Sequence, residues 1–207
     1  MNIDKAIRKQ KKSYKRFLLS MCFIFFILPL ALFLSKAFDV FYIIYLIIIE
    51  MLIFIAIFIR SDKEALKFKN DWFRLKIFLG INKKPIIINC EKIMLVHTED
   101  IVSREGDKNE FKIILLSTSK FRSERMIEVN LKFLKNHTYV AHHYNRLKIL
   151  MPEEQFYFTV IKRGGLRKYP LLDVIYKSCT HACFTEECIE KIKFYRENSQ
   201  YYTDKKI

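Results

Sequence analysis

Two long apolar runs near the start of the chain limit what it can fold into. The first is FLLSMCFIFFILPLALFL, residues 17–34, and the second is VFYIIYLIIIEMLIFIAIFI, residues 40–59. A helix of about 20 residues crosses the hydrocarbon core of a bilayer, so both runs are long enough. Only SKAFD separates them. The sequence therefore predicts two antiparallel transmembrane helices joined by a tight turn.

A soluble hairpin and a signal peptide both fit these runs less well. A buried helical hairpin of a soluble domain needs a polar stripe that meets water, whereas these runs are apolar on every face. A signal peptide has an apolar core of about 7–15 residues, shorter than the first run, and a second span does not follow it at once. Ser35-Lys36-Ala37 does fit the small-x-small pattern of a cleavage site, so cleavage stays an alternative.

Basic residues are distributed unequally around the two runs. Seven Lys or Arg lie in residues 1–16 and four more in residues 60–69, whereas the turn holds only Lys36. The end of a transmembrane helix that has more flanking basic residues usually lies in the cytoplasm. We therefore expect a two-span protein of the cell membrane with both termini in the cytoplasm. Its net charge of +15 suits a surface of anionic lipid headgroups.

One carboxylate, Glu50, stands in the middle of the second run. A charged residue at a helix centre costs about 2.5–3.5 kcal/mol on insertion, which the apolar neighbours offset. Folding the hairpin about Ala37 places Glu50 near the level of Ile24, with Ser20 within about a turn. We predict that Glu50 and Ser20 form a membrane-helix contact, within the hairpin or with another subunit. A proton-linked site is the alternative, and it lacks a charged companion.

Residues 60–80 predict an amphipathic juxtamembrane helix. Their apolar side chains recur at three- and four-residue steps, and Gly80 is a suitable C-terminal stop. Trp72 and the basic residues around it are typical of a helix at headgroup level, so Trp72 is a candidate interfacial anchor. A helix packed on the following domain accounts for the pattern equally well.

Residues 81–198 predict a β-rich cytoplasmic domain. Short β-prone runs are separated in several places by turn residues; they lie at 85–90, 92–97, 111–118, 126–131, 138–144, 147–151, 156–161 and 170–176. Such spacing favours a mostly antiparallel sheet, sandwich or small barrel. His142 and His143 would then point to opposite faces of one strand.

The last predicted element is a C-terminal amphipathic helix that starts near Phe184. Thr185 can cap it, and an apolar stripe follows through Cys188, Ile192 and Tyr195. Strands followed by one terminal helix are similar in layout to pleckstrin-homology-like domains, which implies a barrel or sandwich. The expected fold is thus a membrane-anchored α+β protein: a basic segment (1–16), a helical hairpin (17–59), the domain, and a polar tail (199–207).

Candidate metal ligands gather in CTHACFTEEC, which contains Cys179, His181, Cys183 and Cys188. Four such side chains suffice for a closed zinc site. Their spacing matches no standard zinc motif, however, and Cys188 falls on the apolar stripe, where Cys commonly packs as a small hydrophobe. We expect no metal and no cofactor. We also expect a non-enzymatic protein, because the sequence has no phosphate-binding glycine loop, nucleophile elbow or H-E-x-x-H.

The segment IKRGGLRKYP is the best candidate surface. Lys162, Arg163, Arg167 and Lys168 bracket a Gly-Gly turn. An ordinary charged loop accounts for them too. As a functional surface they would contact anionic headgroups, at about 1 kcal/mol for each basic residue near the membrane.

The features together predict an interaction or accessory component of a membrane complex. Its partner would be another membrane protein or a second copy of the chain, beside the lipid bilayer itself. The alternative is a membrane-tethered nucleic-acid-binding component of a DNA-transfer or phage system. It is less favoured because the aromatic residues do not interleave with basic ones as a single-strand stacking surface requires.

Overall fold

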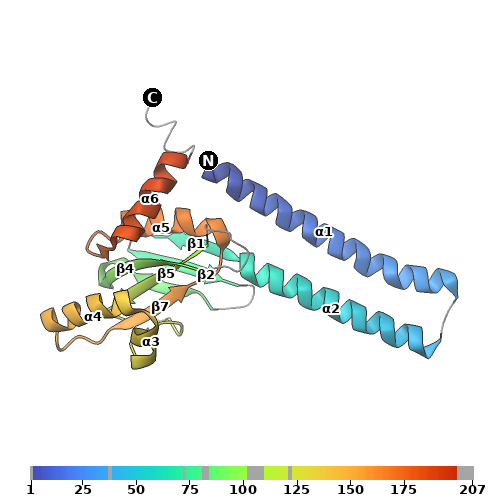
Figure 1. The fold of residues 1–207 in the computed structure, drawn as a ribbon, viewed down its shortest axis with the longest axis horizontal. Coiled ribbons are helices and arrows are strands. Elements are labelled where there is room, and N and C mark those ends of the chain that lie inside the picture. Colours follow the sequence, from blue (N-terminus) through green and yellow to red (C-terminus); the bar gives the residue numbers. More distant parts are fainter. Residues whose placement is uncertain are drawn as a thin grey trace.

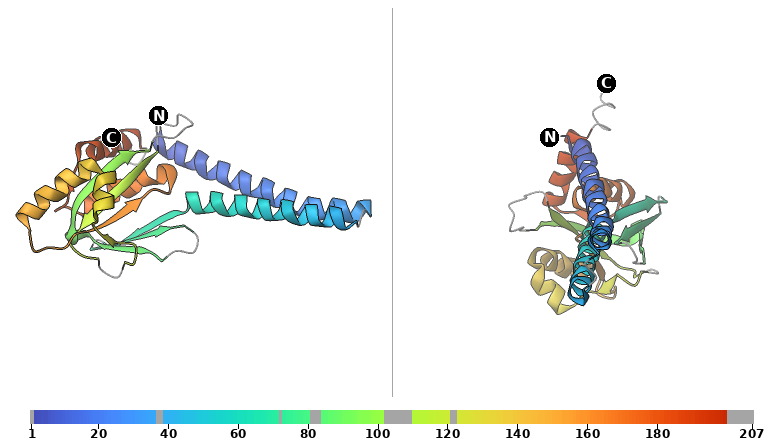
Figure 2. Two further views of the ribbon diagram at one scale, coloured as in Figure 1. Left: turned by 60° about the horizontal axis from the view of Figure 1, so that its bottom comes forward. Right: turned by 90° about the vertical axis from the view of Figure 1, so that its right-hand side faces the viewer.

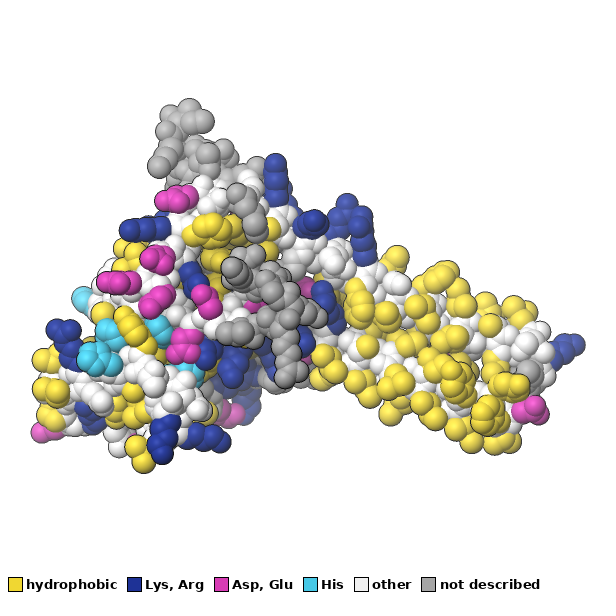
Figure 3. Space-filling view, in the orientation of Figure 1, with side chains coloured by type: hydrophobic (Ala, Val, Ile, Leu, Met, Phe, Trp, Pro, Cys, Tyr) yellow, Lys and Arg dark blue, Asp and Glu magenta, His cyan; other side chains and the backbone are white. Residues whose placement is uncertain are grey.

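Two long helices project together from a mixed α/β domain (Figures 1 and 2). The computed structural model describes residues 2–36, 39–71, 73–80, 84–101, 110–120 and 123–199. Helices α1 (Ile3–Ser35) and α2 (Val40–Glu64) contain the two apolar runs and are long and apolar enough to cross a membrane. Their apolar side chains are largely exposed, as the hydrophobic surface in Figure 3 shows, rather than buried in a protein core.

Helix α1 begins well before the first apolar run. Residues 1–16 were expected as a separate basic segment, but helix starts at Ile3, where the Asn2 side chain accepts a hydrogen bond from the Lys5 N–H at 3.1 Å. The Ile3 side chain is fully buried in the core of the domain. The Ser199 hydroxyl donates to Asp4 Oδ2 at 2.8 Å. The first turns of α1 are therefore packed on the domain.

The strands form two separate sheets. The first has the order β1 (Leu66–Asn70), β2 (Arg74–Leu79), β3 (Ile86–Asn89), and the second has the order β6 (Ile127–Glu128), β7 (Tyr157–Ile161), β5 (Phe111–Ser117), β4 (Ile93–Asp100), β8 (Cys183–Phe184). All pairs are antiparallel except β4 with β8. Among the described residues the sheets do not close into a barrel. Strands predicted at 85–90, 92–97, 111–118 and 156–161 are confirmed.

The helices of the domain are α3 (Leu131–Asn136), α4 (Thr138–Leu150), α5 (Lys168–Ser178) and α6 (Glu186–Asn198), with short 3-10 turns η1 (Cys90–Lys92) and η2 (Gly165–Arg167). The predicted C-terminal helix is confirmed as α6, with Cys188, Ile192 and Tyr195 buried. The strands predicted at 138–144, 147–151 and 170–176 are wrong, because these residues form α4 and α5. His142 and His143 are therefore neighbours on a helix.

The predicted juxtamembrane helix over residues 60–80 is also wrong. α2 ends at Glu64, and a β1–β2 hairpin follows. In β2 the side chains of Leu75, Ile77 and Leu79 are buried, while those between them are more exposed. This two-residue alternation is that of a strand with one face on a core. The candidate anchor Trp72 lies outside the described residues.

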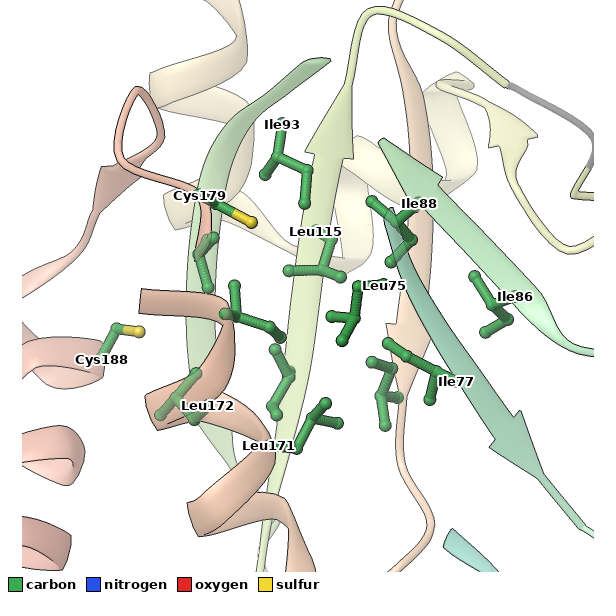
Figure 4. Packing of buried hydrophobic residues seen from close by; sticks show 14 of the residues in the cluster. Leu75, Ile77, Ile86, Ile88, Ile93, Leu115, Leu171, Leu172, Cys179 and Cys188 are labelled. Atoms are coloured by element: carbon green, nitrogen blue, oxygen red, sulfur yellow. The ribbon is translucent and has the colours of Figure 1, made fainter. Parts of the chain in front are cut away.

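Strand β5 lies between two apolar cores. Ile113 and Leu115 belong to the main core, which also contains side chains from the first sheet and from α5, including Leu75, Ile77, Ile88, Leu171 and Leu172 (Figure 4). Ile114 and Leu116 belong to a smaller core beneath α3 and α4. Since successive strand residues point to opposite faces, the second sheet is covered on both sides.

Residues 162–168, here called the junction turn, connect β7 to α5 and contact both long helices. The Gly164 N–H donates to the Lys63 carbonyl at 3.0 Å, and the Leu166 N–H donates to Gln10 Oε1 at 3.3 Å. The Tyr14 hydroxyl lies 2.6 Å from Ser61 Oγ, which sets the register of α1 against α2. The hairpin is thus attached to the domain by more than its chain connection.

Gly164 allows the junction turn to pack against the start of β1, next to the end of α2. Its φ is +108°, and a Cβ there would lie 2.4 Å from Leu66 Cδ2. We expect Gly164→Ala to lower the free energy of unfolding by about 3 kcal/mol or more, from backbone strain and overpacking together. Denaturant unfolding of the purified full chain measures this loss.

Gly165→Ala is the matched control. Its φ is +50°, and the atoms nearest to its Cβ belong to the end of the Gln10 side chain, which can rotate away but then loses its hydrogen bond from the Leu166 N–H. The expected loss is about 2 kcal/mol, from left-handed strain and one hydrogen bond together. Equal losses in the two variants would contradict this account of the turn.

Candidate functional site

A cavity of about 430 Å³ opens beside the junction turn, where the two sheets meet. We call it the junction pocket. Its apolar walls come from the ends of β2 and β3 and from β6 and β7; they are Leu79, Ile86, Ile127, Phe158 and Val160. Its charged lining residues are Glu124, Arg125, Lys162 and Arg163. The pocket therefore offers an apolar groove with a mostly basic rim.

Two carboxylates near the pocket are each paired with a cation. Asp62, in the last turns of α2, forms an ion pair with Arg163 of the junction turn. Glu124 forms an ion pair with Lys84, and both side chains are exposed. The first pair links the α1–α2 hairpin to the pocket, and the second lies in water and contributes little to stability.

Two further cations at the pocket have no carboxylate partner within the part of the chain that the structure describes. Arg125 donates from Nη1 to the Leu79 carbonyl at 3.3 Å. Burial and the nearby charge of Arg163 lower the pKa of Arg125, while the Asp62 carboxylate acts in the opposite direction. Lys162 is exposed at the rim. The pocket thus has two cations that form no ion pair of their own with a carboxylate of the described residues.

The predicted anionic-surface residues divide into two groups. Lys162 and Arg163 line the junction pocket, but the other two have structural contacts. Arg167 donates from Nη1 to the Leu66 carbonyl at 3.3 Å. Lys168 is fully buried, so its prediction as a surface residue is wrong; its Nζ donates to the carbonyls of Phe111 and Lys162. Burial lowers the pKa of Lys168 to about 8.

Arg125 was not predicted from the sequence. It lies in a short turn before the two-residue strand β6, within no periodic pattern. Only the packing of β6 and β7 beside the first sheet brings it to the same cavity as Lys162, 37 positions later in the chain. No local signal in the sequence predicts that approach.

A second group of polar side chains lies between β4 and the helices α4 and α6, where His and acidic side chains gather on one face in Figure 3. His97 on β4 is buried, and its Nδ1 lies 3.0 Å from Thr185 Oγ1. Thr185 precedes α6 as predicted, but its hydroxyl binds His97 rather than capping the helix. The His97 ring stacks on Tyr139, with centroids 4.9 Å apart.

Glu99 connects this histidine to two further basic side chains. Its carboxylate binds His137 Nδ1 at 2.8 Å and Lys112 Nζ at 2.6 Å. Burial alone would raise the pKa of Glu99, but the hydrogen bonds from Lys112 and His137 outweigh it, and the pKa lies below its ordinary value. His97 Nε2 is 3.6 Å from Glu99 Oε1 and has no hydrogen-bond partner among the described residues.

Burial lowers the pKa of His97, which keeps the buried ring neutral near pH 7. Glu99 and Glu187 act in the opposite direction, while His143 and His137 lower the pKa further. The arrangement joins β4, β5, α4 and α6 through one network. Apart from His97 Nε2, its groups are engaged with one another, so we assign it a structural role.

The cysteine-rich segment does not bring its possible ligands together. Cys179 and Cys188 are buried in the main core, whereas His181 and Cys183 are exposed. Burial raises the pKa of Cys188 to about 12, which disfavours the thiolate that binds metals. Across the described ranges, no group of three or more His, Cys, Asp or Glu is placed to hold a metal ion.

Glu50 lies on the face of α2 that is half-buried against α1. Counting eleven residues back from Ser61, and eleven forward from its partner Tyr14, places Glu50 level with Phe25. This agrees with the predicted level near Ile24. Ser20 is exposed on another face of α1, and within the described residues no hydrogen bond joins it to Glu50. The predicted Glu50–Ser20 contact is therefore not formed within the hairpin.

Comparison with known proteins adds little to this geometry. No family model matches the chain, and no solved structure matches it. A protein of Borreliella burgdorferi (strain ATCC 35210 / DSM 4680 / CIP 102532 / B31), described as an uncharacterized protein, is 29% identical over 108 residues. The match covers 51% of this chain and 10% of that protein, so the chain spans about a tenth of the length of this curated relative.

The pKa of His97 predicts an acid-sensitive domain. Below the ordinary His pKa of about 6.5, the unfolded chain binds a proton that the folded chain resists, so stability falls as pH falls from about 6.5, by up to about 1.4 kcal/mol per pH unit. The contribution of Glu99 to the free energy of unfolding is lost in a separate pH range, below about pH 4.5. His97→Gln should flatten the slope between pH 6.5 and 5.

Thermal unfolding of the full chain across this pH range measures the slope. His181→Gln, at an exposed position outside the network, is the control and should leave the slope as in the wild type. An unchanged slope in His97→Gln would contradict the role given to burial of His97.

Proposed function

We propose that this protein is a membrane-anchored, non-enzymatic interaction or accessory component of a membrane complex. In this proposal both termini are cytoplasmic, and the domain faces the inner leaflet of the cell membrane. The observation that carries it is that the first turns of α1 pack on the domain while the outward faces of both apolar helices are exposed.

The orientation rests on the contacts of α1 and on the distribution of charge. Ile3 and Gln10 contact the domain, so the start of α1 and the domain lie on the same side of any membrane that the hairpin crosses. Seven basic residues precede the first apolar run, against Lys36 alone in the turn. Such asymmetry favours the cytoplasm for the basic side.

The proposed interaction lies within the membrane. α1 and α2 each turn one stripe of side chains toward the other, and large apolar side chains on the remaining faces are exposed, including Phe23, Phe26, Ile47 and Ile48. These faces suit lipid, a helix of another membrane protein, or a second copy of this chain. Glu50 is only half-buried, so its carboxylate can reach a polar group on such a helix.

A non-enzymatic role is supported by the burial of three side chains that could otherwise take part in chemistry. Cys179, Cys188 and His97 are all buried in packed surroundings. A nucleic-acid-binding role draws less support, because Arg167 and Lys168 donate to internal carbonyls rather than standing free on the surface.

Substitution of Glu50 tests the proposed interaction. Glu50→Gln should preserve assembly, because an amide still donates and accepts hydrogen bonds. Glu50→Leu should weaken it by about 0.6–2 kcal/mol, the usual worth of a hydrogen bond between membrane helices. The yield of crosslinked complex in native membranes, compared among the three forms, measures the effect.

Two results would contradict this role of Glu50. If Gln reduces crosslinking as much as Leu does, titration of the carboxyl group is what matters. If both variants crosslink like the wild type, Glu50 has no part in association. Ser20→Ala is the control, since Ser20 lies on a different face of the hairpin.

A further inference from the structure

We propose that the junction pocket binds the phosphate of an anionic phospholipid from the inner leaflet. The first carbons of the lipid's acyl chains would lie along the apolar walls of the pocket. The inference rests on the proposed membrane-anchored function. It assigns the charged part of the ligand to Arg125 and Lys162, with Arg163 between the pocket and α2.

The pocket lies close to the end of the membrane helix. Asp62, which pairs with Arg163, is three residues beyond Ile59, the last residue of the apolar run. At 1.5 Å per residue this places Asp62 about 4–5 Å past the apolar run, at the level of lipid headgroups. Gly80, at the end of β2, is also next to Asp62, since a Cβ there would lie 2.3 Å from Asp62 Oδ1. Both walls of the pocket therefore begin near the interface.

The charges of the pocket match a phosphate. Asp62 and Glu124 are already paired, which leaves Arg125 and Lys162 as cations without a carboxylate among the described residues. The charge of Arg163 acts against that of Arg125, and Asp62 counteracts it from one side only, so an anion beside the two guanidinium groups would stabilise both. A guanidinium group binds phosphate oxygens through two parallel hydrogen bonds, and an ammonium group adds a point charge.

The apolar walls favour a lipid over a free anion. The cavity that the cations line is also lined by Leu79, Ile86 and Val160. Inorganic phosphate would gain nothing from contact with these apolar side chains. A volume of about 430 Å³ is within the range of small-molecule sites. A molecule that is anionic at one end and apolar at the other satisfies both parts of the lining.

An extended peptide is the competing occupant. β6 pairs only with Tyr157 and Phe158 of β7, so the outer edge of the rest of β7 is open to another strand within the described residues. Strand addition depends on backbone hydrogen bonds and does not require Arg125 or Lys162. The unpaired cations and the nearby apolar helix therefore favour the lipid.

Photolabelling of the full chain in lipid nanodiscs tests the inference. Discs of phosphatidylcholine would carry a trace of photoreactive phosphatidylglycerol or of the matched photoreactive phosphatidylcholine. The phosphatidylglycerol probe should label peptides containing residues 124–127 or 158–163 about tenfold more than the control probe, as one charge-assisted contact of about 1.4 kcal/mol implies. The Arg125→Gln/Lys162→Gln double variant should reduce labelling to the level of the control probe.

Two further variants separate charge from shape. Lys132→Gln/Lys193→Gln removes the same charge from exposed positions outside the pocket, and should label like the wild type. Ile127→Trp, at an exposed position in the lining, narrows the pocket without changing its charge, and should reduce labelling. Thermal unfolding confirms that each variant is folded before labelling is compared.

Several outcomes would overturn the inference. These are equal labelling by the two probes, labelling that survives loss of Arg125 and Lys162, and protection of the pocket by a co-purified peptide. Competition by inorganic phosphate as effective as competition by soluble short-chain phosphatidylglycerol would overturn the assignment to lipid. A protein that is inserted in the discs but not labelled refutes only the pocket, whereas release by alkaline carbonate refutes the membrane-anchored function as well.

Discussion

The packing of α1 on the domain is the contact on which the rest of the arrangement depends. Ile3 is buried in the main core, and Gln10 accepts a hydrogen bond from the junction turn. Both residues belong to the helix that continues into the first apolar run. The domain is consequently attached to both long helices, through packing of α1 and through the chain connection after α2. The junction pocket therefore keeps a fixed position near the end of α2. A single flexible connection after Glu64 would not achieve this.

Basic residues serve two different purposes in this chain. Arg167 and Lys168 donate to backbone carbonyls and hold the junction turn against β1 and β5. Burying Lys168 has a cost, because desolvation lowers its pKa to about 8, and its hydrogen bonds to two carbonyls offset part of that cost. Arg125 also donates to a backbone carbonyl, that of Leu79, but neither Arg125 nor Lys162 forms an ion pair with a carboxylate of the described residues, which is why we assign their charge to a ligand.

Elements whose residue pattern fits only one kind of secondary structure were predicted correctly from the sequence. Elements whose pattern fits both a helix and a strand were assigned wrongly. The hairpin and α6 have patterns that only helices satisfy. In β2, Leu75 and Leu79 fit both a four-residue helical step and strand alternation, and the burial of Ile77 decides for the strand. In α5, Pro170 suits the first turn of a helix as well as the start of a strand. For the site, Lys162 and Arg163 were found, but Arg125 reaches the pocket only through tertiary packing.

The sidedness of the first helix tests the central claim most directly. Reporter fusions after Gln10, at Lys36 and after residue 207 would be compared in intact cells. If α1 returns to the domain across the membrane, the first and third reporters should be cytoplasmic and the second external. Reporters after Gln10 and after residue 207 on opposite sides would contradict the account, because Gln10 could not then contact Leu166.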